Sequence, residues 1–178
     1  MPSNCKTTDD IDVTALCKMQ YGMYIVTSKK ADKINGQTAT VVSQVANAPI
    51  QIMLCISKKT LTHEFIKDSG LVGVSVLTQT APMKVIGHFG FRSGRDFDKF
   101  AEIDFKTWKT GCPLVFDNAL AVMEGKVIMQ KALKTHTIFV ANLISAKNIR
   151  KGTAMTYEYY QTVLKGKASE NAPTYHCV

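Results

Sequence analysis

The sequence of 178 residues lacks the short motifs that identify several common classes of enzyme. It contains no HExxH, no GxSxG and no GxGxxG before a helix, which argues against a zinc protease, an α/β-hydrolase and a Rossmann domain. No two of the histidines His63, His88, His136 and His176 have metal-ligand spacing, so we expect no metal site. These absences argue against metal-dependent and nucleophilic hydrolysis.

Cysteine is scarce and poorly placed for cross-linking. The five cysteines are Cys5, Cys17, Cys55, Cys112 and Cys177, and none forms a CxxC pair. An odd number of widely spaced cysteines argues against disulfides and against a structural zinc site. Cys55 and Cys112 lie among apolar residues and are interpreted as buried free thiols. We therefore expect a cytoplasmic protein in a reducing environment.

Long apolar runs and long runs of one charge are also missing. Residues 1–12 are polar and unlike a signal peptide, and no apolar stretch reaches the length of a membrane span. The net charge is +8, from 22 basic and 14 acidic residues, but the basic residues form pairs rather than a stripe. We expect no membrane partner and no nucleic-acid partner, whereas an anionic cofactor such as a phosphate or a dinucleotide fits the charge.

The composition is that of one globular domain spanning residues 1–178, with barrel and helices over about 15–164 and a polar tail over 165–178. β-Branched and aromatic runs predict strands over 21–28, 37–45, 51–57, 71–78 and 135–146, and two more within 114–133. Short helices are expected over 11–18, 61–68, 83–89 and 157–164, with a charged loop over 90–104. Closely spaced strands with few helices predict a mainly β fold, namely a closed antiparallel barrel.

The segment from Asn35 to Val45 (NGQTATVVSQV) is the most informative part of the sequence. Asn-Gly favours a hairpin turn, because both residues tolerate positive φ. The strand expected after it alternates Val and Ala with Thr, Ser and Gln and carries no charge. Such a face can hydrogen-bond a neutral, planar ligand that is rich in heteroatoms. The pattern also fits an uncharged barrel strand, and the segment alone leaves both interpretations open.

Two basic segments are candidate anion sites. The segment SKKTLTHE, from Ser57, joins a strand to a helix and brings hydroxyls and lysines to the helix N-terminus, which suits a phosphate. It also fits an ordinary cap by Thr60. The segment FGFRSGRDFDKF brings Arg92, Arg95 and Lys99 onto a glycine-containing loop, where arginine suits phosphate geometry. A solvated loop with local Arg–Asp pairs is the alternative.

The order of the segments is more specific than any one of them. YGMYIVTS, NGQTATVVSQV, SKKTLTHEFI, LVGVSVL, HFGFRSGRDFDKF, GCPL and HTIFV follow one another between about residues 15 and 175. This order resembles the flavin reductase-like family of FMN-binding split β-barrel proteins. Within that family the chain is similar to NADH:FMN oxidoreductases and flavoredoxins, including the N-terminal domains of high-molecular-weight rubredoxins. The resemblance implies a homodimer with one FMN per subunit near the interface.

The resemblance also implies which residues hold the cofactor. The isoalloxazine would lie along Asn35, Gly36, Gln37, Thr38, Ala39 and Thr40, with Ser43 and Gln44 continuing that wall. The ribityl chain and phosphate would be lined by Ser57, Lys58, Thr60, Thr62 and His63. The outer phosphate or nucleotide side would be shaped by Arg92, Ser93, Arg95 and Lys99. His136 matches a family histidine near the nicotinamide and is the candidate catalytic residue, although a lone histidine in an apolar strand is more often part of the core.

The implied function is electron transfer from NAD(P)H through bound FMN to free flavin or to a redox partner protein of the rubredoxin or flavodiiron type. The flavin accepts the hydride, so no obligatory acid-base residue is expected. The family often has Gly-Asp and Gly-Glu where this chain has Lys134-Thr135 and Ala141-Asn142, so the chain departs from the family pattern on the nicotinamide side. The alternative is a non-enzymatic FMN module that relays electrons between proteins. Cys177 stands about where rubredoxin-fused relatives begin a Cys-x-x-Cys iron site, and it also fits an exposed tail thiol.

Overall fold

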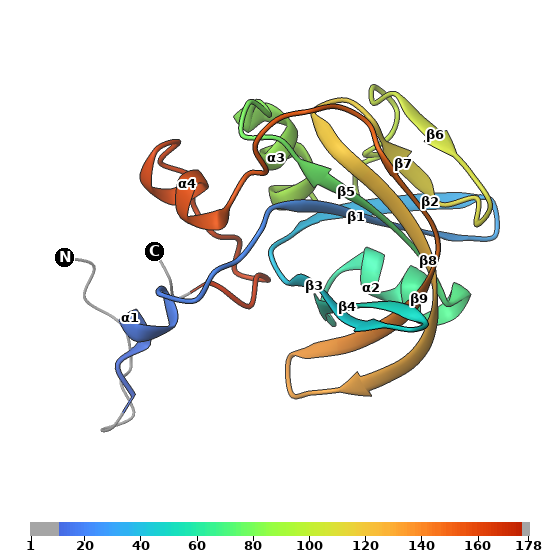
Figure 1. Cartoon of the computed structure of the whole chain (residues 1–178), viewed down its shortest axis with the longest axis horizontal. Coiled ribbons are helices and arrows are strands. Elements are labelled where there is room, and N and C mark those ends of the chain that lie inside the picture. Colours follow the sequence, from blue (N-terminus) through green and yellow to red (C-terminus); the bar gives the residue numbers. More distant parts are fainter. Residues whose placement is uncertain (1–10, 176–178) are drawn as a thin grey trace.

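The computed structural model describes residues 11–175, which form a mainly β structure (Figure 1). Seven antiparallel strands form one sheet in the order β2-β1-β5-β8-β9-β4-β3. Their bounds are β1 Tyr24–Lys30, β2 Lys33–Ala39, β3 Val42–Asn47, β4 Ile50–Ser57, β5 Leu71–Leu77, β8 Ala119–Ala132 and β9 His136–Asn148. A separate hairpin consists of β6 Phe105–Thr107 and β7 Pro113–Val115. The expected mainly β, antiparallel fold is confirmed.

The sheet curls, but its hydrogen-bonded ladder does not close, which corrects the expectation of a closed barrel. The strands β2 and β3 are consecutive in the chain and lie at opposite edges of the sheet. Thr40 and Val41 carry the chain across the gap between these edges, and Val41 O accepts a hydrogen bond from Cys55 N at 3.2 Å. The single strand expected over 37–45 is therefore divided, and its two halves belong to different edges.

The turn between β1 and β2 lies earlier than the Asn-Gly pair predicts. Residues 31–32 form it, with Ala31 at φ 50°. Asn35 and Gly36 lie inside β2 and are buried. Asn35 Nδ2 donates a hydrogen bond to Thr62 Oγ1 at 3.0 Å. Tertiary contacts thus override the turn preference of this dipeptide.

One long strand, β8, covers both AVMEGKV and the run after it, which were expected as two strands within 114–133. It pairs with β9 from Ala121 to Ala132, with register shifts at 124–125 and 127–129. Such bulges bend a strand without ending it. A Cβ on Gly125 would lie 2.8 Å from Asn142 O of β9, so the bend also depends on a glycine. The change of pattern in this part of the sequence therefore marks a bend and not a loop.

The helices of residues 11–175 are α1 Val13–Leu16, α2 Leu61–Ser69, α3 Met83–Phe91 and α4 Tyr157–Thr162. Thr60 caps α2 by accepting a hydrogen bond from His63 N at 3.3 Å, and Gly70 ends it at φ 67°. Both α2 and α3 pack against β2. The helix α3 continues to Phe91, so the loop expected from residue 90 begins two residues later. The short α1 buries no residue and stands apart from the sheet (Figure 1).

Two groups of buried apolar side chains position the elements around the site. The group between the sheet and α2 includes Leu54, Ile56, Ile66, Val72 and Phe139. The group that joins β1 to α3 and α4 includes Met23, Ile25, Ile86, Phe89 and Tyr160. Full burial of one such side chain contributes about 1.5–3 kcal/mol. Because these groups include residues of α2, α3 and α4, the three helices have fixed positions relative to the sheet.

The polar segment after α4 is not a free tail in the part that the structure describes. Residues 165–175 fold against the body of the protein, and Thr174 is only 2% exposed. Cys5, His176 and Cys177 lie outside the described residues. Within residues 11–175 no helix is long and apolar enough to span a bilayer. The same residues contain no group of three His, Cys, Asp or Glu side chains placed to hold a metal ion.

Candidate functional site

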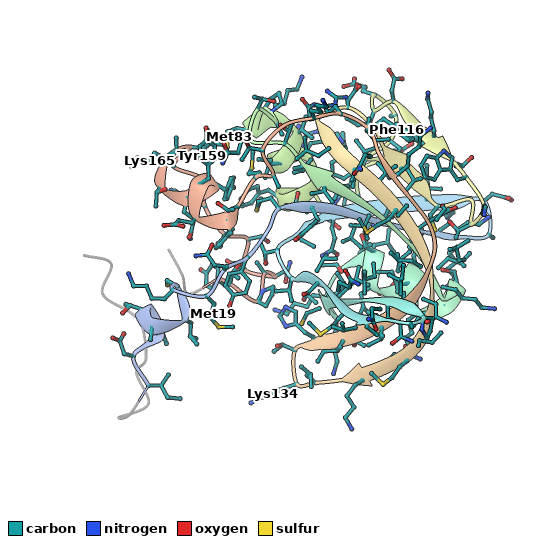
Figure 2. The ribbon with its side chains drawn as sticks, in the orientation of Figure 1. Met19, Met83, Phe116, Lys134, Tyr159 and Lys165 are labelled. Carbon is teal, nitrogen blue, oxygen red and sulfur yellow. The ribbon has the colours of Figure 1, made fainter. Side chains whose placement is uncertain are left out.

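A cleft opens where the ends of β2 and β4 meet α3 and α4. Residues of three of its walls are Met23, Asn35, Gln37, Thr38, Ala39, Thr40, Cys55, Ser57, Lys59, Thr60, Leu61, Thr62, Ile86, Phe89, Gly90, Phe91, Arg92, Ser93, Gly94 and Lys99. The fourth wall consists of Tyr157, Tyr160, Lys167, Ala168, Ser169, Asn171, Ala172 and Pro173. Tyr159 and Lys165 mark the α4 side of the molecule in Figure 2.

Most of the residues that the sequence predicts for cofactor binding line this cleft. They are Asn35, Gln37, Thr38, Ala39, Thr40, Ser57, Thr60, Thr62, Arg92, Ser93 and Lys99. They come from three segments that are far apart in the sequence. The fold brings them together because α2 and α3 both pack against β2.

The β2 wall offers hydrogen-bonding groups without charge. Gln37 Oε1 is buried and has no hydrogen-bond partner in the structure. Thr38 Oγ1 donates to Ile86 O of α3 at 3.0 Å, which leaves its lone pairs able to accept. A buried oxygen without a partner costs free energy unless a ligand or water satisfies it. The wall therefore fits the polar edge of a neutral heterocycle.

The junction between β4 and α2 offers an anion site. Ser57, Lys59 and the first residues of α2 line the cleft here. Thr60 is both the cap of α2 and a lining residue, so the two interpretations of this segment are compatible. A helix N-terminus carries partial positive charge, to which Lys59 adds a full charge. This end of the cleft fits a phosphate.

The loop after α3 closely approaches the same junction. A Cβ on Gly94 would lie 2.2 Å from Asn35 Oδ1, so the approach requires a glycine. Asn35 in turn is bonded to Thr62 at the start of α2. Arg92 lines the cleft, and its guanidinium lies 4.4 Å from the centre of the Phe97 ring. Arg92 thus adds a second basic side chain to the cleft.

Lys99 is the buried cation of the cleft. It is 5% exposed, and Nζ donates hydrogen bonds to Gly36 O at 2.9 Å and Phe89 O at 3.0 Å. Among the described residues it forms no salt bridge. Burial lowers its pKa to about 8 from the ordinary value of 10.5, because an ammonium ion loses hydration there. An anionic ligand in the cleft would compensate this buried charge.

Three predicted residues of the β2–β3 segment do not line the cleft. Gly36 contributes its carbonyl oxygen to Lys99 instead. Ser43 and Gln44 lie on β3 and are exposed. They belong to the opposite edge of the sheet because the chain changes edges at residues 40–41. The wall predicted to continue past Thr40 therefore ends there.

Three predicted polar residues of the basic segments also lie off the cleft. Lys58 Nζ donates to carbonyl oxygens of the turn between β8 and β9, so at this junction Lys59 and not Lys58 lines the cleft. The ring of His63 is bonded to a β9 threonine hydroxyl at 2.8 Å, and burial lowers its pKa. Arg95 forms an exposed ion pair with Glu64. Each of the three has a partner within the protein that holds it away from the cleft.

His136 does not line the cleft but holds a residue that does. Its Nε2 lies 3.2 Å from Asn171 O, and because a carbonyl only accepts, Nε2 carries the hydrogen. Its Nδ1 lies within hydrogen-bond distance of Thr135 Oγ1, at 2.8 Å. The geometry gives His136 a positioning role in the structure, and its catalytic role stays a prediction.

The sequence did not reveal the fourth wall. The residues after α4 carry no motif, and their polar composition is typical of a solvated tail. The available signal was the aromatic run of α4, where Tyr157 and Tyr160 stack with ring centroids 6.0 Å apart. Aromatic side chains on so short a terminal helix indicate that it packs on the body of the protein.

Taken together, the walls define a cleft for an elongated ligand with a neutral ring and a phosphate. Comparison with known proteins shows that residues 16–167 match the flavin reductase like domain. The chain is 42% identical over 165 residues to the ferric-chelate reductase (NAD(P)H) of Archaeoglobus fulgidus, covering 93% of this chain and 98% of that protein. It is 41% identical over 165 residues to the high molecular weight rubredoxin of Moorella thermoacetica, covering 93% and 72%.

The fold is similar to the solved NADH:FAD oxidoreductase SgcE6 of Streptomyces globisporus, with a TM-score of 0.75, 23% identity and coverage of 88% of this chain and 93% of that one. The chain belongs to the flavin reductase-like family. As a member of this family it is a flavin-dependent oxidoreductase, as the resemblance implies. NAD(P)H is the reductant named for the Archaeoglobus fulgidus relative. The residues present fit a flavin, because the unpartnered Gln37 Oε1 lines the same cleft as the basic end.

Proposed function

We propose that the protein holds FMN in this cleft and passes electrons from NAD(P)H to free flavin or to a redox partner protein. The observation that carries the proposal is that one cleft has both an uncharged wall and a basic end. Gln37 and Thr38 belong to the first, and Lys59 and the α2 N-terminus to the second. FMN has a neutral ring at one end and a single phosphate at the other, so its chemistry matches both.

Within this proposal the side chains bind and orient rather than react. Gln37 Oε1 can accept a hydrogen bond from a ring N–H, and the Thr38 hydroxyl holds α3 against β2. Lys59 and the hydroxyl of Ser57 hold the phosphate, whereas the Thr60 hydroxyl donates to Ser57 O and caps α2. The cofactor, when bound, supplies the hydride chemistry, which requires no acid-base side chain. The fourth wall excludes water from the cleft.

Two relatives suggest candidate acceptors. The similarity to a ferric-chelate reductase supports a ferric chelate as an acceptor to be tested beside free flavin. The similarity to a high molecular weight rubredoxin supports the second candidate function, a module that relays electrons between proteins through bound FMN. Its partner would be a rubredoxin or a flavodiiron protein. The two candidates differ in how fast NAD(P)H reduces the bound flavin.

We also propose that the protein is a cytoplasmic homodimer. Large apolar side chains are exposed on the β3–β4 hairpin and on β8, with Val45 at 50%, Ile50 at 52%, Ile128 at 51% and Met129 at 53%. These strands are close neighbours through β9, so the side chains support an interface with a second copy. Among the described residues, Cys17, Cys55 and Cys112 are free thiols, which fits a reducing compartment. Sedimentation of the purified protein tests the dimer.

The visible spectrum of the purified protein under anaerobic conditions tests the proposed function. We expect a yellow protein whose flavin is released by acid as FMN and is bleached rapidly by NADH or NADPH. A yellow protein that bleaches slowly with both, and rapidly with a reduced protein donor, would support the relay. A protein that neither carries nor binds FMN would contradict both candidates.

A further inference from the structure

We infer that residues 166–174 form a strap that retains the flavin, so that the flavin acts as a fixed prosthetic group and not as a substrate that enters and leaves. The inference rests on the proposed function, because it takes FMN to fill the cleft. Residues 167–169 and 171–173 of the strap line the cleft as its fourth wall. The strap belongs to no helix or strand. A ligand in the cleft is therefore enclosed on one side by irregular chain.

Hydrogen bonds to two different elements hold the strap near its start and near its middle. Tyr160 Oη of α4 donates to Lys167 O at 2.9 Å. His136 Nε2 of β9 donates to Asn171 O at 3.2 Å. Tyr160 is itself 2% exposed, so this anchor is part of the rigid core. The strap thus begins on α4 and is tied at its middle to the sheet.

The last residue of the strap is buried against the chain crossing that follows β2. Thr174 Oγ1 lies 3.5 Å from Thr40 Oγ1, and the two residues are 2% and 6% exposed. Figure 1 shows the red segment after α4 passing beside the start of β3, where this crossing ends. Between the anchors the strap makes its own turn, with Ala172 N donating to Ser169 O at 2.8 Å. It therefore crosses the cleft from α4 to β2.

The strap can open without unfolding the sheet. Within the described residues it forms no ladder with a strand, and Tyr160 and His136 each anchor it by a single hydrogen bond that water can replace. Its start depends on close contact, since a Cβ on Gly166 would lie 2.1 Å from the ring of Tyr160. Lys165, just before it, has a φ of 56°, so the chain turns sharply into the strap. A cover of this kind slows ligand exchange while it is closed.

Retention of the flavin has a consequence for the reaction. An enzyme that releases reduced flavin delivers electrons by diffusion of the cofactor. An enzyme that retains flavin delivers them to an acceptor that comes to the cleft. The strap therefore assigns this chain to the second kind, with electrons leaving to a chelate, a second flavin or a protein that approaches from outside.

A reversible cross-link tests the inference in the full-length protein. Thr40→Cys and Thr174→Cys place two thiols where the strap ends, and oxidation after loading with FMN locks it. We expect FMN to leave the oxidised protein at least about tenfold more slowly than the reduced one, which corresponds to about 1.4 kcal/mol. The release is followed by the fluorescence of free FMN after dilution into excess competitor. Each single variant, oxidised in the same way, controls for Cys55, which also lines the cleft.

Two results of this experiment would overturn the inference. If the cross-link forms in the apoprotein but not after FMN is loaded, the strap occupies the place of the flavin and is displaced by it. If the cross-link forms in the holoprotein and the release rate is unchanged, the strap does not retain the flavin.

A second variant loosens the strap, and its result is independent of the yield of the cross-link. Gly166→Ala collides with Tyr160 and should raise the release rate about tenfold. Tyr160→Phe removes only the hydroxyl anchor and should raise the rate less. Unchanged release rates in both variants would overturn the inference. Equilibrium titration of the unmodified protein with FMN separates the two claims, because absence of binding contradicts the proposed function, whereas binding with insensitive release contradicts the strap alone.

Discussion

The two basic segments beside the cleft, residues 57–60 and 92–99, contain similar side chains and use them in two ways. In the first, Lys59 lines the cleft while Lys58 is hydrogen-bonded to the turn between β8 and β9. In the second, Arg92 lines the cleft while Arg95 is paired with Glu64. Hydrogen bonds to carbonyl oxygens hold Lys58 away from the cleft, and the ion pair with Glu64 does the same for Arg95. Each segment therefore supplies its own matched control.

Among the basic residues of the two segments, replacement of Lys99 should have the largest effect on the affinity for FMN. Lys99→Met removes the buried cation of the cleft, and a hydrogen bond to a charged group contributes about 1.5–3 kcal/mol. We expect the affinity for FMN to fall by more than tenfold, measured by quenching of FMN fluorescence at pH 7. Circular dichroism of the apoprotein controls for folding. A dissociation constant within twofold of the unmodified protein would show that Lys99 does not face the ligand.

The pH dependence of the apoprotein should follow from the same lysine. Burial lowers the pKa of Lys99 to about 8, from 10.5 in the ordinary state, so the folded protein binds fewer protons than the unfolded chain between these values. The stability contribution is therefore fully present above pH 10.5 and is lost as the pH falls through about 8. Denaturant unfolding at several pH values should show that the free energy of unfolding rises with pH in the unmodified protein. The rise should be smaller in Lys99→Met.

The affinity for FMN should change with pH in the opposite sense. A charged Lys99 favours an anionic ligand, so affinity falls as the pH rises through about 8. Lys99→Met should lack this fall. Parallel curves for the two proteins would assign the pH dependence to another group.

Replacement of Gln37 should give a smaller effect that separates binding from folding. Gln37→Leu removes a buried oxygen that has no partner in the apoprotein, so the apoprotein should be at least as stable as before. One hydrogen bond to the ligand is lost, and FMN affinity should weaken by about 0.5–1.5 kcal/mol. Thermal unfolding measures the stability of the apoprotein, and FMN titration measures the affinity. A large loss of apoprotein stability would instead make Gln37 a structural residue.

Replacement of Lys58 or Lys59 should change the affinity for FMN by less than the variants above, because both lysines are exposed. Lys59→Ala should weaken FMN binding by about 0.2–1 kcal/mol, as for exposed charge pairs, and the loss should shrink at high salt. Lys58→Ala should leave binding unchanged. Titrations at two salt concentrations measure both. Equal losses for the two variants would mean that neither lysine contacts the phosphate specifically.

The paired arginines give the last and smallest contrast. Arg95→Gln breaks an ion pair with Glu64 that is exposed and screened by solvent, so it contributes little to stability and nothing to the cleft. Its FMN affinity should stay within about twofold. Arg92→Gln should show the larger loss. If Arg95→Gln weakens FMN or NADH binding more than Arg92→Gln, the loop adopts another arrangement with ligand bound.

Local signals in the sequence predicted much of the fold and part of the site. The β-branched runs identified most strands, and Thr60 and Gly70 identified the two ends of α2, because propensity and capping act over a few residues. The uncharged β2 residues and the α2 junction were also predicted, because each consists of residues that are adjacent in the sequence. The family resemblance supplied the order in which these segments meet.

The rest of the site depends on contacts between distant residues. No local signal shows that the chain passes from one edge of the sheet to the other at Thr40. The division into β2 and β3 depends on the different strands with which they pair. The choice between Lys58 and Lys59 depends on carbonyl groups some 75 residues away. The wall after α4 was missed for the same reason, since its anchors lie on β9 and at Thr40.

The most direct test of the central claim is a comparison of FMN with riboflavin, which lacks the phosphate, on the same protein. If one cleft binds the ring on β2 and the phosphate at the α2 junction, the protein should bind FMN at least about tenfold more tightly than riboflavin, or about 1.4 kcal/mol. Lys59→Ala should narrow that difference, and Lys58→Ala should leave it unchanged. Equal affinity for FMN and riboflavin, or no binding of either, would contradict the account.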